Sequence, residues 1–125
     1  MKVLDGRFAV CRLDPSAPTP AWPAGSFVSI TRTPDELSII CAEESVPEDV
    51  PRVERGWCAL RVEGPMPFDM VGIAATITAP VAAANISLLL VATFDTDYLL
   101  LKRATFERAV KALRAAGIDV QTTTV

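Results

Sequence analysis

The order of apolar segments after residue 56 constrains the fold of this chain more than any other feature. From there the chain alternates between β-prone segments and segments with helical periodicity. The predicted strands are residues 57–63, 86–92, 97–102 and 118–122. One helix is predicted between the first and second strands, and another between the third and fourth. The order β-α-β-β-α-β is that of a split βαβ unit, with two helices on one face of an antiparallel sheet. The second half therefore predicts an α+β domain of the ferredoxin-like type.

Both helices have recognisable ends. The first is predicted to begin at Asp69, which is placed as its N-cap, and to end at Asn85, which tolerates left-handed backbone. Its apolar stripe recurs every three or four residues, at Met70, Ile73, Ile77 and Val81. Pro80 lies inside this pattern, so a kink or a restart is expected there. The second helix is expected to be capped by Thr105 or a neighbouring residue and to end at Gly117.

The first half has no segment with a usable helical period. Residues 7–13, 26–32 and 37–42 predict strands, and the last two form a hairpin. Four prolines between Pro15 and Pro23 exclude a helix or a central strand from the connector at 14–25. We expect Trp22 in this connector to anchor it against the body of the protein. The acidic segment 43–54 reads as a linker, so we predict an abbreviated N-terminal unit at 1–54 and a complete domain at 55–125.

Composition excludes several classes of function. The formal net charge is -3 and no basic stripe is present, which argues against nucleic acid as a partner. No segment has the ~20 unbroken apolar residues of a membrane span, and an acidic residue interrupts the apolar start of the chain, so we expect a cytoplasmic protein. The chain has no histidine, which lowers the prior for catalysis and for a metal site. Its three cysteines are widely spaced and are expected to be small buried hydrophobes.

Two polar segments of the second half suggest a binding site for a small zwitterion. The segment 64–72 leads into a helix N-terminus, whose N–H groups attract a carboxylate. Asp95 and Asp97 lie in the turn between two strands, where a carboxylate can bind an ammonium or guanidinium group. Each feature also has an ordinary structural explanation, since Asp69 can serve only as a helix cap and the two turn aspartates can bond their own backbone.

The same segments resemble a known family. They are the runs 55–65, 71–73, 79–87 and 93–100, of which the most specific is Thr-Phe-Asp-Thr-Asp-Tyr-Leu-Leu at 93–100, together with Arg-Gly-Trp at 55–57 and Val-Gly-Ile at 71–73. With the hairpin at 27–40, they are similar to the small bacterial ACT-domain proteins related to the ACT modules of the cytosolic arginine sensors, the CASTOR family.

This resemblance implies two ACT-like units in tandem, of which the first is abbreviated. It implies a ligand site at an interface between units, and because this chain holds only one pair, a comparable interface would need a homodimer. The ligand would be a free amino acid, with arginine as one candidate, and no cofactor or metal is implied. Carried over by motif, the ligand-binding residues would be Asp69, Val71, Gly72, Ile73, Thr93, Phe94 and Asp97.

Three functions are consistent with these observations. The first is a regulatory amino-acid sensor, in which the ligand favours one arrangement of a dimer. The alternative is an interaction or dimerisation module without a ligand, in which residues 86–92 or 118–122 pair with another chain as an edge strand. The third is an enzyme that uses a cysteine or the Asp69 and Asp97 carboxylates. We expect no catalysis, because no cysteine has a basic partner motif and Cys58 lies in an apolar strand.

Overall fold

The computed structural model describes residues 1–63 and 72–122 and divides the chain into two compact units. The N-terminal unit consists of Asp5–Trp57. The C-terminal unit consists of Met1–Leu4 together with Cys58–Val125. The division therefore falls inside one strand, β5 (Arg52–Arg61), and not at residue 54, and the first four residues belong to the C-terminal unit. Each unit has a hydrophobic cluster of its own.

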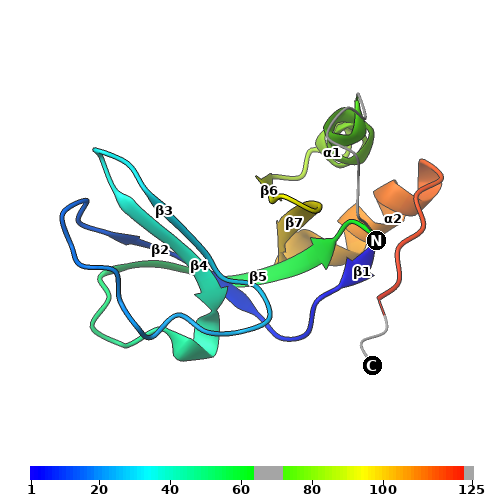
Figure 1. The fold of residues 1–125 in the computed structure, drawn as a ribbon. Helices are drawn as coiled ribbons and strands as arrows, with labels where there is room; N and C mark the ends of the chain where they lie inside the picture. The colour runs from blue at the N-terminus through cyan, green and yellow to red at the C-terminus, as the bar shows by residue number, and fades with distance from the viewer. Residues whose placement is uncertain (64–71, 123–125) are drawn as a thin grey trace. The chain divides into compact units, whose positions relative to one another are not determined.

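The N-terminal unit is built from strands, as the sequence predicted. Its elements are β2 (Phe8–Leu13), β3 (Ser29–Arg32), β4 (Leu37–Ala42), the 3-10 turn η1 (Glu43–Ser45) and the first part of β5. The strands lie in the order β3-β4-β2-β5, and each pair is antiparallel (Figure 1). Residues 14–28 contain no helix or strand, in agreement with their proline content.

Strand β5 begins at Arg52 and not at the predicted Trp57, and it contains a bulge. Phe8 pairs with Trp57 and Val10 pairs with Glu54, so two residues of β5 lie opposite the single residue Ala9. Gly56 has a φ of 80° at this point, where a residue with a side chain would be strained. The charged residues at the start of β5 had the composition of a linker, and their pairing with β2 overrides it.

The core of the N-terminal unit is formed by alternate residues of β2 and β4. Ala9 and Cys11 from β2 lie beside Leu37, Ile39 and Cys41 from β4, all at most 1% exposed. Trp22 packs against this cluster from the connector, as predicted. All three cysteines of the chain are buried and none forms a disulfide, in agreement with the prediction that they are small buried residues.

The C-terminal unit has the α+β arrangement that the sequence predicted. Its elements are β1 (Lys2–Val3), the end of β5, α1 (Ile73–Ala83), β6 (Leu88–Ala92), β7 (Asp97–Lys102), the 3-10 turn η2 (Arg103–Thr105) and α2 (Phe106–Ala115). The strand order is β5-β7-β6, and β1 pairs with β5 (Figure 1). Leu99 and Leu101 share one cluster with buried residues of both helices, whereas Leu100 between them does not, so both helices pack on the same face of β7.

The two helices end in the same way, at the residues that the sequence indicated. Asn85 has a φ of 61° and Gly117 a φ of 87°, so both have left-handed backbone. After α1, the N–H of Ile86 donates to the carbonyl of Val81, and after α2 the N–H of Ile118 donates to that of Leu113. These bonds satisfy carbonyl groups of the last turns and direct Ile86 and Ile118 back onto the core.

Several predicted boundaries differ from the structure. Helix α1 begins at Ile73 and not at Asp69, because Gly72 with a φ of 81° stands at the N-cap position. The helix continues through Pro80 without a restart. Thr105 precedes α2, but its hydroxyl donates to the carbonyl of Lys102 and does not cap the helix.

The closing strand predicted at 118–122 is reduced to a single bridge. Gln121 bridges Lys2 in parallel, and its N–H donates to the carbonyl of Met1. The unpredicted strand β1 therefore lies beside both β5 and this segment, and the buried side chain of Met1 belongs to the core of the C-terminal unit. In the part of the chain that the structure describes, no helix is long and apolar enough to cross a membrane.

Candidate ligand-binding site

The turn between β6 and β7 holds three of the residues that the sequence singled out. The N–H of Thr93 and its hydroxyl both donate to the carbonyl of Thr96, at 2.8 and 2.9 Å. The N–H of Thr96 donates back to the Thr93 hydroxyl at 3.3 Å. These bonds close the turn and place Phe94 at its tip, where the side chain is 80% exposed. Asp97 follows as the first residue of β7 and is half-buried.

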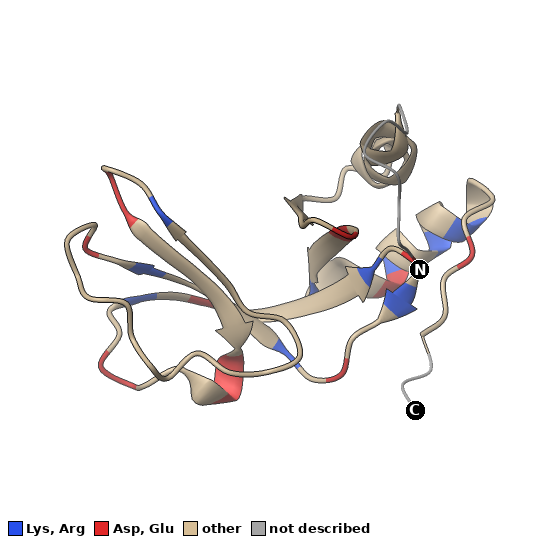
Figure 2. Ribbon diagram, viewed as in Figure 1, with Lys and Arg blue, Asp and Glu red and all other residues tan. Residues whose placement is uncertain are grey.

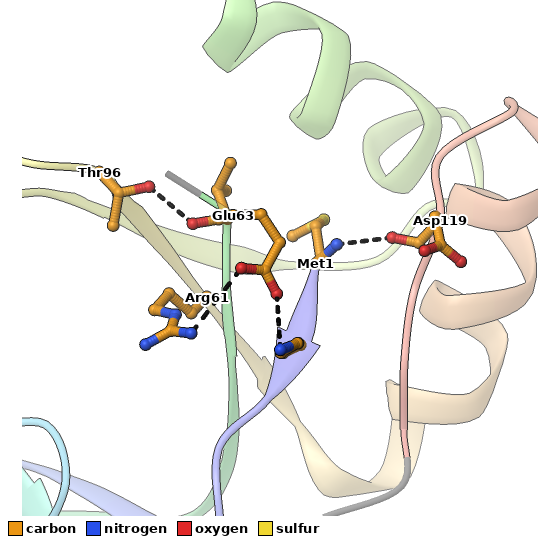
Figure 3. Close-up of polar contacts among 7 residues, drawn as sticks. Met1, Arg61, Glu63, Thr96 and Asp119 are labelled. Atoms are coloured by element: carbon orange, nitrogen blue, oxygen red, sulfur yellow. Dashed lines mark hydrogen bonds and ion pairs between the residues drawn. The ribbon is translucent and has the colours of Figure 1, made fainter. Parts of the chain in front are cut away.

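Thr96 joins this turn to the end of β5. Its hydroxyl donates to the carbonyl of Val62 at 2.7 Å (Figure 3). The N–H of Val62 donates to the carbonyl of Asp97 at 2.9 Å. Thr96 is only 8% exposed and is a buried polar residue among the described residues. The two bonds hold the backbone of Asp97 against the end of β5.

Carboxylates predominate around the turn. Asp95 is exposed and Asp97 is half-buried, and no lysine or arginine of the described ranges 1–63 and 72–122 lies within 4 Å of either carboxylate. Glu63, one residue beyond Val62, is already engaged, since its carboxylate pairs with Lys2 at 3.6 Å and Arg61 at 3.8 Å (Figure 3). Among the residues that the structure describes near the turn, Asp95 and Asp97 are therefore carboxylates without a cationic partner.

The start of α1 has the opposite electrostatic character. The first N–H groups of any α-helix have no partner within the helix and carry a partial positive charge. No acidic residue occupies the first turn of α1 to offset that charge. Gly72 at the N-cap position is exposed, and Ile73 packs against the core cluster that also contains Val62. This terminus can accept a carboxylate.

The structure describes the positions of five of the seven residues predicted from the sequence. Thr93, Phe94 and Asp97 lie together in the turn, and Gly72 and Ile73 lie at the start of α1. Asp69 and Val71 lie outside the described residues. The sequence reasoning missed Thr96, whose buried hydroxyl holds the turn, because a threonine in a turn of mixed polar residues carries no signal of burial. It also missed Lys2 and Arg61, which engage Glu63.

Comparison with known proteins identifies the family. A model of the ACT domain matches residues 52–115, which is slightly more than half of the chain. The chain belongs to the ACT domain family. A second model, which describes an N-terminal domain, matches residues 6–49. The β5-α1-β6-β7-α2 order is accordingly the ferredoxin-like fold of an ACT domain.

Two mammalian proteins are similar to this chain over part of its length. Human CASTOR3P is 34% identical over 90 residues, which cover 62% of this chain and 55% of that protein. The bovine cytosolic arginine sensor for mTORC1 subunit 1 is 29% identical over 86 residues, which cover 61% of this chain and 26% of that protein. This ACT-domain chain therefore spans about half of the first relative and about a quarter of the second.

Solved structures extend the similarity over the whole chain. Protein Atu0741 from Agobacterium tumefaciens has a TM-score of 0.93 and 39% identity, and the match covers 99% of this chain and 92% of that one. Aspartate kinase from Clostridium acetobutylicum has a TM-score of 0.63 at 14% identity over 88% of this chain and 32% of the kinase. The second match shows that the two proteins share a fold.

Proposed function

We propose that this ACT-domain protein is a regulatory sensor that binds a free amino acid and has no catalytic activity. The proposed site lies on the C-terminal unit, at the turn 93–97, the end of β5 and the start of α1. The single observation that carries the proposal is the pair of bonds that join Thr96 and Asp97 to Val62. These bonds hold the backbone of Asp97 at the end of β5. Its carboxylate has no cationic partner among the described residues.

The two charge types of the site match the two ends of a zwitterion. A helix N-terminus without an acidic first turn suits the carboxylate of an amino acid. Asp97, with Asp95 nearby in the turn, suits its ammonium group or a basic side chain. The proposed contacts are Gly72 and Ile73 for the first and Thr93 and Asp97 for the second, with Phe94 as an apolar wall.

We include Asp69 and Val71 among the proposed ligand-binding residues because they match the family motif. Arginine is the first ligand to test, because one relative is named as a cytosolic arginine sensor. The same name supports a cytosolic location for this protein. A basic ligand also suits a site in which the unpartnered side chains are carboxylates.

We further propose that the protein acts as a homodimer with two ACT-like units in each chain, the N-terminal one abbreviated. That unit contains β2, β3, β4 and the first part of β5, and its one helical element among the described residues is the short 3-10 turn η1. Ligand binding would favour one arrangement of the dimer, and a partner protein would respond to that arrangement. A ligand can shift this equilibrium only by its difference in affinity for the two arrangements.

A second candidate function is dimerisation without any ligand. Strand β6 is at the end of the order β5-β7-β6 and consists of Leu88, Leu89, Leu90, Val91 and Ala92. Four of these residues are half-buried, and an apolar strand at the edge of a sheet is suited to pair with another chain. In this function Asp95 and Asp97 would be ordinary turn residues.

A thermal-shift screen against the twenty free amino acids separates the two functions. A ligand that binds only the folded protein raises its melting temperature by mass action. We expect one amino acid, or a few related ones, to raise it in the wild type. The rise should be lost in Asp97→Asn, which removes the charge but keeps the size of the side chain. The rise should be retained in Asp119→Asn, because Asp119 is remote in sequence from the turn. The backbone carbonyl of Asp119 accepts a hydrogen bond from the Met1 amino group at 2.6 Å, and this carbonyl is unchanged in the variant.

The opposite results are equally informative. No shift with any amino acid at millimolar concentration, together with a stable dimer, would favour the interaction module. A shift that Asp97→Asn leaves unchanged would retain the sensor but remove Asp97 from its site. Equal loss in both variants would point to a general effect of charge.

A further inference from the structure

A groove lies along α2, outside the proposed amino-acid site. It encloses about 430 Å³. Residues of α2 line it, together with Thr122 from the segment after the helix. This volume is within the range of pockets that hold small molecules. None of its lining residues belongs to the turn 93–97, the end of β5 or the start of α1.

The floor of the groove is apolar. Phe106 and Val110 are one helical turn apart on α2 and both line the groove. Val110 is 5% exposed and belongs to the core, and Phe106 is half-buried against the same cluster. Phe106 therefore offers part of its ring to a ligand while the rest is held by the core.

The rim of the groove is basic, on a protein that is acidic as a whole. Arg108, Lys111 and Arg114 line it, against the single carboxylate of Glu107. Five of the twelve basic residues of the chain lie between Lys102 and Arg114, although the net charge of the chain is -3 (Figure 2). Three of the five, Arg108, Lys111 and Arg114, lie on α2 itself, and such a concentration creates a local positive potential.

Two of these cations are held in place by the fold. The Arg108 guanidinium donates to the carbonyl of Ala84 at 2.9 Å, and the Arg114 guanidinium donates to that of Val120 at 2.8 Å. Both partners are neutral, so the charges are not cancelled. Over residues 1–63 and 72–122, no carboxylate lies within 4 Å of Arg108, Lys111 or Arg114.

We propose that this groove binds a small organic anion that carries an apolar group. The anionic head, a carboxylate or a phosphate ester, contacts Lys111 and Arg114, and the apolar group lies on Phe106. Such a site goes beyond the proposed sensing of an amino acid, because it lies on other residues and selects for negative charge where the turn 93–97 selects for positive charge.

The probe for this site is 8-anilinonaphthalene-1-sulfonate, which combines an anion with aromatic rings and fluoresces when it leaves water. We expect it to bind the full-length protein and to shift the amide resonances of α2 in a heteronuclear NMR titration. Lys111→Glu should weaken binding about tenfold, because it reverses a charge at the head group. The matched charge reversal Arg103→Glu, on the same basic segment but outside the groove, should change the affinity less than about twofold.

A second variant tests the groove by shape and not by charge. Thr122→Trp adds bulk at the exposed Thr122 without removing a core contact, and it should abolish binding of the probe. Phenylacetate and phenyl phosphate should each displace the probe, and the one that acts at lower concentration identifies the head group. Probe binding that survives Thr122→Trp, shifts centred outside α2, or equal weakening by Lys111→Glu and Arg103→Glu would each overturn the proposal.

Discussion

Replacing Thr96 with valine removes one hydroxyl and retains the branched shape of the side chain. The hydroxyl donates to the carbonyl of Val62 at 2.7 Å, and both residues are 8% exposed. The variant therefore leaves a buried carbonyl without this donor and creates no cavity. Loss of one partner of a buried hydrogen bond costs ~1–3 kcal/mol, so we expect the free energy of unfolding to fall by about 2 kcal/mol.

The matched control is Thr78→Val in α1. Its hydroxyl also donates to a carbonyl, that of Ala74 at 2.8 Å, but this carbonyl lies four residues earlier in the same helix and already accepts a helical bond. The control should cost less than about 0.5 kcal/mol, because Ala74 keeps its backbone partner.

Urea denaturation followed by circular dichroism measures both variants, and thermal melting should show a fall of roughly 8 °C for Thr96→Val. Native-state hydrogen exchange adds a local test, because the N–H of Val62 donates to Asp97 beside the altered bond and should exchange faster. A stability of Thr96→Val within about 0.5 kcal/mol of the wild type would refute the argument that this bond holds the turn to β5.

Two further predictions concern the N-terminal unit. Gly56→Ala should destabilise the protein by ~1–2 kcal/mol, because Gly56 has left-handed backbone. Gly25→Ala should cost more, because its new Cβ would also lie 2.8 Å from the Cβ of Ala42. Urea denaturation ranks the two variants, and an equal or smaller cost for Gly25→Ala would contradict this order. Burial and the nearby thiol of Cys41 raise the pKa of Cys11 to about 11 from an ordinary value of 9.0. The unfolded chain therefore loses this proton at lower pH than the folded one, so the free energy of unfolding should fall as the pH rises from about 9 to about 11, with a smaller fall in Cys11→Ala; identical pH profiles for the two proteins would show that Cys11 does not contribute.

Periodic segments of the fold could be predicted from the sequence. Strands β4 and β7 have the predicted boundaries, because each is a short apolar run with three consecutive buried residues. The ends of both helices were also predictable, since Asn85 and Gly117 tolerate the left-handed backbone that ends them.

Elements held mainly by pairing could not be predicted. Strand β1 has only two residues and no period, and it forms because β5 and Gln121 offer partners on either side. The start of β5 is charged and was taken for a linker, although β2 pairs with it. The start of α1 moved to Ile73 because the backbone of Gly72 turns there, which side-chain periodicity does not reveal.

The residue types of the candidate site could be predicted from the sequence, but the hydrogen bonds that hold the turn in place could not. Asp97 was predicted because carboxylates in a turn are visible in the sequence, and Phe94 was predicted from the family motif. Their fixed position depends on the Thr96 hydroxyl and the Val62 carbonyl, which meet only once β5 and β7 lie side by side. The binding roles of Gly72, Ile73, Thr93, Phe94 and Asp97 stay predictions.

The most direct test of the proposed sensor is an NMR titration of the full-length protein with arginine and, in turn, with the other free amino acids. The central claim predicts that one ligand shifts the amide resonances of residues 93–97, of Val62 and Glu63, and of Gly72 and Ile73, in a saturable way. Saturable shifts confined to other residues, or no saturable shift with any amino acid, would contradict it.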